Sequence, residues 1–119
     1  MTIPFVDLRA QHDEVRAEIE AAFRDVLDQS NFIGGPHVAN FEADFARYCG
    51  VAHAIAVATG TDALRLALAA IGVRPGDEVI TVPNTFIATT EAISQAGGRP
   101  VFVEIDPDTY TLDPGKIEG

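Results

Sequence analysis

The sequence predicts an α/β fold in which a partial parallel or mixed sheet is covered by helices on both faces. Three apolar, β-branched runs of strand length, residues 54–58, 78–82 and 100–105, alternate with segments whose apolar residues recur at helical spacing. Strand–helix–strand order builds right-handed crossover units and hence a parallel sheet. Three strands fall below the usual sheet width of about five or six. We therefore expect a piece of a larger domain.

Two helices are predicted before the first strand. Apolar residues at helical spacing place the first helix from about Leu8 to Asp28, and the second from roughly His37 to Tyr48. The sequence Gly34-Gly35-Pro36 between them is a strong loop signal. Gly50 is the expected end of the second helix.

Strand–helix units are predicted over the rest of the chain. One helix runs from about Thr61 to Ile71 and another from Thr85 to Ala96, each followed by glycine. The tail from Asp106 onward is expected to be an irregular connection. We divide the single, incomplete domain into a helical segment of about 1–50 and strand–helix units of about 51–119.

Composition restricts the class of protein. The chain has 119 residues, 47% hydrophobic and 22% charged, with a formal net charge of −10, so it is globular and is not expected to bind nucleic acid. No apolar run approaches the ~20 residues of a membrane-spanning helix. The beginning of the sequence lacks the pattern of a signal peptide, which predicts a cytoplasmic protein. The lone Cys49 is expected to be buried and can form no intrachain disulfide.

A phosphate site is one interpretation of the turn between the first predicted strand and the helix that follows it. Unpaired amides and the positive end of the helix dipole favour an anion there. Gly60 would let the backbone approach a phosphate, and the Thr61 hydroxyl and amide could donate to it. The alternative is that Thr59 or Thr61 only caps the helix. The spacing alone does not separate the two.

The end of the second predicted strand offers a further candidate. Phe86 follows Pro83 among polar residues, where its ring could stack on a flat heteroaromatic ligand or pack against the start of a helix. Asn84 could be a helix cap or a ligand contact, and the cap is the preferred interpretation. Asp62 is interpreted as a complement to the helix dipole.

Other titratable residues give weaker signals. Glu104 and Asp106 are interpreted as a solvated strand end, although paired carboxylates can do acid–base work. The three histidines, His12, His37 and His53, share no metal-ligand spacing. Neither Gly-x-x-x-x-Gly-Lys-Ser/Thr nor Gly-x-Gly-x-x-Gly occurs, which disfavours a nucleotide-binding P-loop and a standard dinucleotide site.

Taken together, ordered motifs along nearly the whole chain resemble the N-terminal part of the DegT/DnrJ/StrS family of sugar aminotransferases. Each motif alone is weak, and the signal is their order and spacing. The matching segments are Ile3–Leu8, Phe32–Pro36, Phe41-Glu42, Phe45-Ala46, Thr59–Leu64, Pro75–Ile80, Pro83–Thr89, Pro100–Val103 and Asp106.

This resemblance implies the large domain of a fold type I enzyme that depends on pyridoxal 5′-phosphate. Such enzymes work as homodimers and transfer an amino group, typically from glutamate, to a nucleotide-linked keto-sugar. The residues matching Gly60 and Thr61 hold the cofactor phosphate in that family, and an aromatic residue matching Phe86 stacks on the pyridine ring.

The resemblance stops short of the catalytic lysine, which lies farther along the chain in that family. Lys116, the one lysine here, matches no motif and is not assigned that role. We therefore expect a piece of an aminotransferase that is inactive alone, with no catalytic residue of its own. Two alternatives remain: a dehydratase relative that uses the same cofactor with histidine in place of lysine, and a non-catalytic small α/β binding module.

Overall fold

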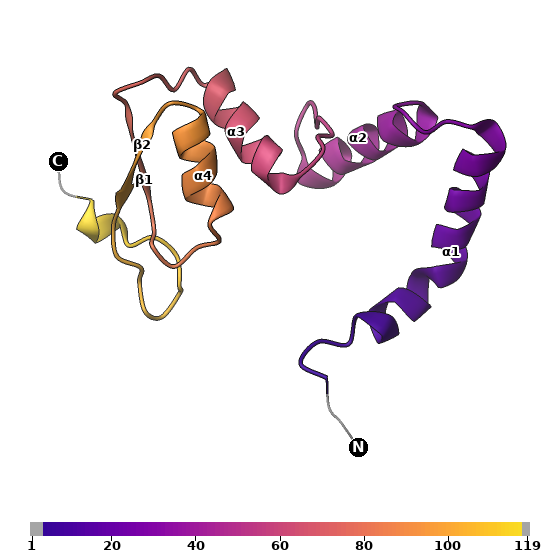
Figure 1. Ribbon diagram of the computed structural model, residues 1–119. Helices are drawn as coiled ribbons and strands as arrows, with labels where there is room; N and C mark the ends of the chain where they lie inside the picture. Colours follow the sequence, from indigo (N-terminus) through magenta and orange to yellow (C-terminus); the bar gives the residue numbers. More distant parts are fainter. Residues whose placement is uncertain (1–3, 118–119) are drawn as a thin grey trace. The chain divides into compact units, whose positions relative to one another are not determined.

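A computed structural model describes residues 4–117 (Figure 1). The chain divides into two compact units, residues 1–56 and 57–119, and each is described by itself. Ile3, the first residue of the Ile3–Leu8 motif, and the last two residues of the tail lie outside the described residues.

The first unit consists of two helices, α1 (Leu8–Gln29) and α2 (Pro36–Cys49), which confirms both predicted helices. Asp7 caps α1, its carboxylate accepting a hydrogen bond from the amide of Ala10 at 3.1 Å. Between the helices, Gly35 has a φ of 87°, a left-handed value that favours glycine, and Pro36 occupies the first turn of α2. Gly50 ends α2 in the left-handed conformation, as the sequence predicts.

A hydrogen bond between side chains joins the two helices of this unit. The His37 imidazole Nε2 lies 2.7 Å from the Asp25 carboxylate, so the start of α2 is tied to the last turns of α1. Hydrogen bonds from His37 and Gln29 lower the pKa of the Asp25 carboxyl, because both stabilise its charged form.

The prediction that Cys49 is buried is wrong. Its thiol is exposed, because Cys49 is the last residue of α2 and no described segment covers that end of the helix. The aromatic residues before it do not form a closed core either. The Phe41 and Phe45 rings stack with centroids 5.6 Å apart, and both side chains remain largely exposed.

The second unit is built around a parallel pair of strands with a helix between them in the chain. Strands β1 (Glu78–Thr81) and β2 (Arg99–Phe102) pair in parallel, and helix α4 (Ala88–Gln95) connects them. The register sets Glu78 opposite Arg99, which form an ion pair, and Thr81 opposite Phe102. This confirms the α/β class and the parallel arrangement.

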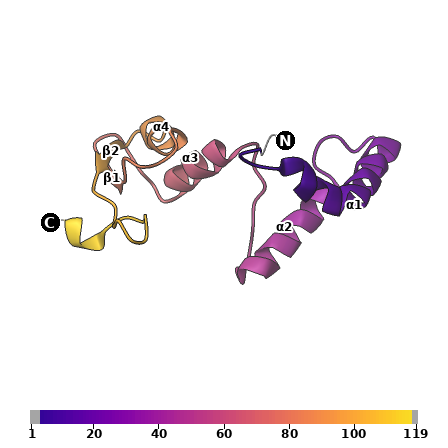
Figure 2. The same ribbon diagram turned by 90° about the horizontal axis from the view of Figure 1, so that it is seen from below.

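Helix α4 packs on one face of this two-stranded sheet, as the two views of the ribbon agree (Figures 1 and 2). Helix α3 (Gly60–Ala70) packs against α4. The small core of the unit consists of Ala88, Ala92 and Ile93, all on α4. Gly98 lies against this core, where an added Cβ would approach Val73, Val79 and Ile93 within 3.3 Å.

The first predicted strand, residues 54–58, is not a strand in the described chain. A strand is defined by hydrogen bonds to a neighbour, and no described segment pairs with these residues. The sheet therefore has one crossover unit where the sequence predicts two. Helix α4 also starts three residues later than predicted, at Ala88. Its cap position is Ile87, with no side-chain cap, so the interpretation of Asn84 as a helix cap is wrong.

The tail forms a short turn structure. Ile105 and Leu112 make an antiparallel bridge, and a 3₁₀ helix, η1 (Pro114–Lys116), follows. Of the helices described, none combines the length and the apolar character that a membrane span requires.

Candidate functional site

The turn before α3 is a capped helix N-terminus in which two backbone amides have no hydrogen-bond acceptor within the helix. The Thr59 hydroxyl accepts a hydrogen bond from the amide of Asp62 at 3.0 Å, and the Thr59 carbonyl accepts one from Ala63. Thr59 is thus the cap, one of the two interpretations that the sequence allows. The amides of Gly60 and Thr61, in the first turn, have no intrahelical acceptor.

The space beside the Gly60 Cα is open where a Cβ would stand. A Cβ added to Gly60 would meet no atom within 4 Å, and Gly60 is not among the glycines with positive φ. Its backbone conformation therefore does not require glycine. A side chain at position 60 would fill this space. A phosphate could occupy the same space.

The charge around the turn is nearly balanced. Asp62 stands in the first turn, where the sequence analysis places it as a complement to the helix dipole. Its carboxylate forms an ion pair with Arg65 at 3.1 Å and accepts a hydrogen bond from the Thr59 hydroxyl at 3.3 Å. Arg65 therefore offsets the negative charge that would otherwise oppose an anion at the same helix end.

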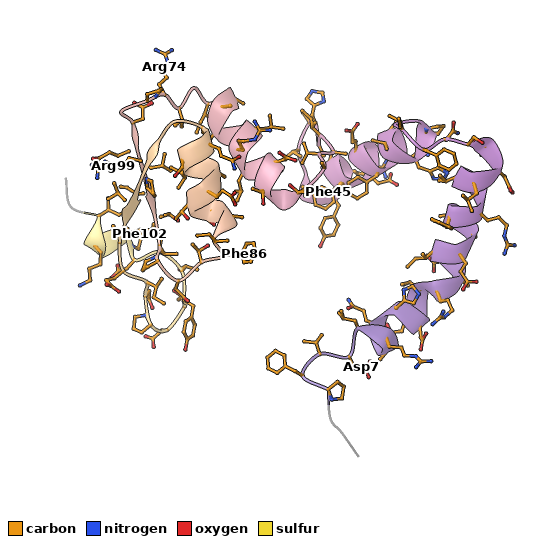
Figure 3. All side chains as sticks on the ribbon, in the orientation of Figure 1. Asp7, Phe45, Arg74, Phe86, Arg99 and Phe102 are labelled. Carbon is orange, nitrogen blue, oxygen red and sulfur yellow. The ribbon has the colours of Figure 1, made fainter. Side chains whose placement is uncertain are left out.

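Phe86 lies in the loop between β1 and α4, and its side chain is 77% exposed. In Figure 3 the ring stands at the start of α4 and points away from the sheet. The backbone of Phe86 has a structural role, since its carbonyl accepts a hydrogen bond from the amide of Thr89 at 3.0 Å. The ring itself is not packed against the helix, so its face is available to a flat ligand.

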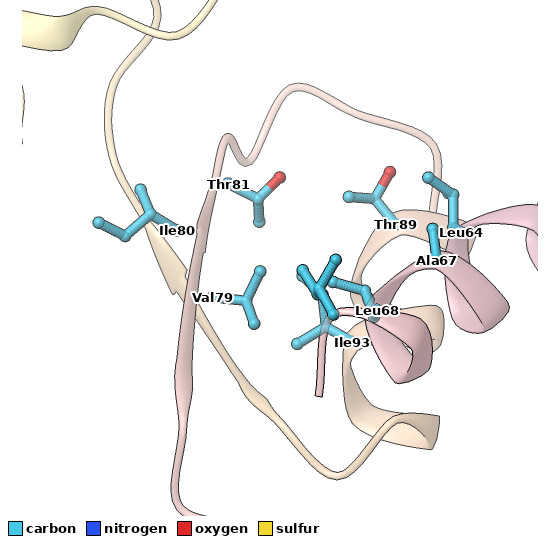
Figure 4. Close-up of a pocket in the computed structure, with 9 residues that line it drawn as sticks. Leu64, Ala67, Leu68, Val79, Ile80, Thr81, Thr89 and Ile93 are labelled. Atoms are coloured by element: carbon cyan, nitrogen blue, oxygen red, sulfur yellow. The ribbon is translucent and has the colours of Figure 1, made fainter. Parts of the chain in front are cut away.

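The structure brings these two candidate segments to the same end of the second unit. Leu64 of α3 lies beside Thr89 of α4, and Leu68 lies beside Ile93 one turn later (Figure 4), so the two helices run in the same direction. Both begin at the end of the unit where β1 finishes (Figure 1). Ligands of open α/β sheets bind beyond the carboxyl ends of the strands, which is where Gly60, Thr61 and the Phe86 loop stand.

A groove of about 260 Å³ lies between α3, β1 and α4 (Figure 4). Its lining is apolar apart from the hydroxyls of Thr81 and Thr89, and it includes none of the predicted site residues. Such a lining cannot hold a phosphate, so the groove is distinct from the candidate site.

Sequence reasoning did not identify two polar contacts, one in each unit. Thr85 and Thr89 share a hydrogen bond of 2.9 Å between their hydroxyls at the start of α4, and their spacing of four residues was a usable signal. The Glu42 carboxylate accepts a hydrogen bond from the amide of Ala56 at 2.8 Å. No local pattern links those two residues, which are fourteen apart.

The other two candidate residues, Asp106 and Glu104, show no sign of a catalytic arrangement in the described chain. Asp106 accepts hydrogen bonds from the amides of Asp108 and Thr109, so its carboxylate closes a turn. Glu104 is exposed, as expected for a solvated strand end. Within residues 4–117, no three His, Cys, Asp or Glu side chains are grouped so that they could hold a metal ion.

Comparison with known proteins identifies relatives along almost the whole chain. The family described as "DegT/DnrJ/EryC1/StrS aminotransferase family" matches residues 13–119. The dTDP-3-amino-3,4,6-trideoxy-alpha-D-glucose transaminase of Streptomyces venezuelae is 48% identical over 116 residues, which are 98% of this chain and 31% of that protein.

Solved structures give the same result. DesV of S. venezuelae, in complex with a ketimine intermediate, has a TM-score of 0.91 at 48% identity, covering 97% of this chain and 31% of that one. NtdA of Bacillus subtilis, with bound cofactor PMP, has a TM-score of 0.89 at 38% identity, covering 98% of this chain and 27% of that one. The chain therefore spans less than a third of the length of these relatives.

Proposed function

The chain belongs to the DegT/DnrJ/EryC1/StrS aminotransferase family, and we propose that it supplies the cofactor-phosphate site of a longer sugar aminotransferase. The cofactor is pyridoxal 5′-phosphate. The reaction moves an amino group, with glutamate as donor, to a nucleotide-linked keto-sugar. The enzyme works as a homodimer. The names of the similar proteins support this class of reaction.

One observation carries the proposal: the amides of Gly60 and Thr61 have no intrahelical acceptor at the N-terminus of α3, and a Cβ on Gly60 would meet open space. The amides of Gly60 and Thr61 donate to the phosphate, the Thr61 hydroxyl adds a third donor, and the helix dipole favours the negative charge. Thr59 is already used as the cap, so it orients the turn without competing for the ligand.

Phe86 supplies the second contact. Its exposed ring covers one face of the cofactor ring and keeps water from that face. When bound, the cofactor supplies the electron sink that lets a proton leave the carbon bearing the amino group. We assign no proton transfer to any residue from 4 to 117, so the catalytic base belongs to a part of the enzyme outside this chain.

Equilibrium binding of pyridoxal 5′-phosphate and of pyridoxal, which lacks the phosphate, tests the site in the full-length enzyme. We expect Gly60→Val to abolish the preference for the phosphorylated form, because the new side chain fills the space above the amides. Ala69→Val, at an exposed position of the same helix, is the control and should leave the preference intact. An undiminished preference in Gly60→Val would place the phosphate elsewhere.

A further inference from the structure

We infer that Thr85 and Thr89 are positioning residues for the ring of Phe86. This inference rests on the function proposed above, in which that ring covers one face of the cofactor. The hydroxyls of Thr85 and Thr89 share a hydrogen bond of 2.9 Å, and Phe86 lies in the stretch of chain that this bond closes. Neither threonine is assigned a contact with the ligand.

Phe86 stands between two points that are tied to the same residue. The side chain of Thr85, directly before it, is bonded to the Thr89 hydroxyl, and the carbonyl of Phe86 accepts a hydrogen bond from the Thr89 amide at 3.0 Å. The rotamers open to a ring depend on the backbone that carries it. The two contacts therefore restrict the direction in which the Phe86 ring projects.

Thr89 is a firm base for this arrangement because it belongs to a packed helix. It lies in the first turn of α4, is half-buried, and lines the groove between α3, β1 and α4 (Figure 4). The next turn of α4 carries the buried residues Ala92 and Ile93. Thr85 and Phe86 are both exposed. The bond between the hydroxyls thus ties an exposed loop to the packed part of the unit.

The start of α4 differs from the start of α3, where a threonine caps the helix. The cap position of α4 is Ile87, and no described side chain makes a cap hydrogen bond there. The Thr90 hydroxyl donates to the carbonyl of Ile87, which follows Phe86. Of the side-chain contacts described at this helix end, the one between Thr85 and Thr89 reaches back past Phe86.

The position of this bond gives it a consequence for the site. A side chain that contacts a ligand must be held within about 0.5 Å and about 10–20° of the productive geometry. A ring on a free loop has to be ordered when the ligand binds, which lowers the affinity, whereas a ring held in advance does not. The two threonines therefore strengthen stacking by Phe86 without touching the cofactor.

Variants of the full-length enzyme test this role through the dissociation constants for pyridoxal 5′-phosphate and pyridoxal. Thr85→Val and Thr89→Val each remove one hydroxyl and keep a β-branched side chain. Thr85→Ser keeps the hydroxyl. Ser94→Ala is the matched control, because it removes an exposed hydroxyl from the same helix, where Ser94 donates to the Thr90 carbonyl at 2.9 Å.

We expect Thr85→Val and Thr89→Val to weaken the binding of both ligands by about two- to fivefold, within the net strength of one hydrogen bond. Both ligands are affected because they share the ring on which Phe86 stacks. Thr85→Ser and Ser94→Ala should bind normally. Normal affinity in either valine variant would overturn the inference. An equal loss in Thr85→Ser or in Ser94→Ala would overturn it too, in favour of a general effect on the loop or the helix.

A double variant separates positioning of the ring from any independent effect of the threonine. Thr85→Val added to Phe86→Leu should cause no loss beyond that of Phe86→Leu alone, because the ring that Thr85 positions is already absent. A further loss of the same size as in the single variant would show that Thr85 acts independently of the ring, and the inference would be wrong.

The same measurements separate this inference from the proposed function. If Phe86→Leu binds both ligands normally, the stacking proposed for Phe86 fails first. If Phe86→Leu weakens binding and the valine variants at Thr85 and Thr89 do not, the stacking stands and the positioning role of the two threonines is wrong.

Discussion

The hydroxyl of Thr59 accepts a hydrogen bond from the amide of Asp62 at 3.0 Å. This contact uses the threonine as the cap of α3 and leaves the amides of Gly60 and Thr61 without an intrahelical acceptor. The proposed role of Thr61, two residues further on, is to bind the cofactor phosphate, and substitution can separate that role from capping by Thr59.

Thr59→Ala should lower the stability of the second unit, because the amide of Asp62 loses its acceptor. The expected loss is about 1 kcal/mol in the free energy of unfolding, the usual value for a helix cap. Urea denaturation of the purified protein measures it. Thr61→Ala is the control, and its effect should stay within about 0.5 kcal/mol. Equal losses in the two variants would show that Thr59 is not the cap.

Thr61→Ala should weaken the binding of pyridoxal 5′-phosphate by about tenfold or more, because it removes a donor to a charged group. The affinity for pyridoxal should not change. Isothermal titration of the full-length enzyme with both ligands measures the difference. Equal affinities of the variant and the unmodified enzyme for the phosphorylated ligand would contradict the proposed role of Thr61.

Phe86→Leu should weaken the binding of both pyridoxal 5′-phosphate and pyridoxal, because the ring that both ligands share loses its aromatic neighbour. The expected loss is about three- to tenfold. Phe86→Tyr keeps the ring and should bind almost normally. Phe102→Leu, at another exposed phenylalanine, controls for the loss of a surface ring. Stacking would be refuted by a Phe86→Leu enzyme with normal affinity for both ligands.

Ile93→Ala should destabilise the second unit by about 2–4 kcal/mol, the usual range for deleting a buried aliphatic side chain. Ile93 is 2% exposed and lies in the small core on α4, whereas Ile87, just before that helix, is 69% exposed. Ile87→Ala should therefore change the free energy of unfolding by less than about 0.5 kcal/mol. Chemical denaturation of both variants makes the comparison, and similar losses would mean that Ile93 is not a core residue.

The hydrogen bond between Asp25 and His37 should weaken at acid pH. The pKa of Asp25 is lower in the folded chain than in the unfolded one, so the pair stabilises the fold above the unfolded pKa of about 3.9. That stabilisation is lost as the pH falls through the folded pKa. Carbon NMR of the Asp25 carboxyl should show a midpoint below about 3.9, which His37→Ala should raise. His12→Ala is the control and should not move it; an unmoved midpoint in His37→Ala would exclude the pair in solution.

Much of the local structure follows from the sequence. The two long helices, the glycine that ends the second of them and the strands around Val79 and Val101 occur where residue periodicity and turn signals predict them. These features depend on interactions between residues a few positions apart. The predicted site residues Gly60 and Thr61 occupy the first turn of α3, and their role toward the cofactor stays a prediction.

Two of the errors concern properties that no local pattern contains. Residues 54–58 have the composition of a strand but no partner among the described residues. Cys49 has apolar neighbours in the sequence, but no described segment covers it. Burial and strand pairing both need a second segment of chain in the right place, and composition alone does not say whether one is there.

The sequence by itself determined the two long helices, the glycine that ends the second of them and the glycine–threonine turn, because each depends on hydrogen bonds and side-chain spacing within about one or two helical turns. Only the tertiary structure decided that α3 and α4 run in the same direction and begin where β1 ends, and that the Glu42 carboxylate holds the amide of Ala56. Those relations join residues distant in the chain, so they follow from the path of the folded backbone and not from any local pattern.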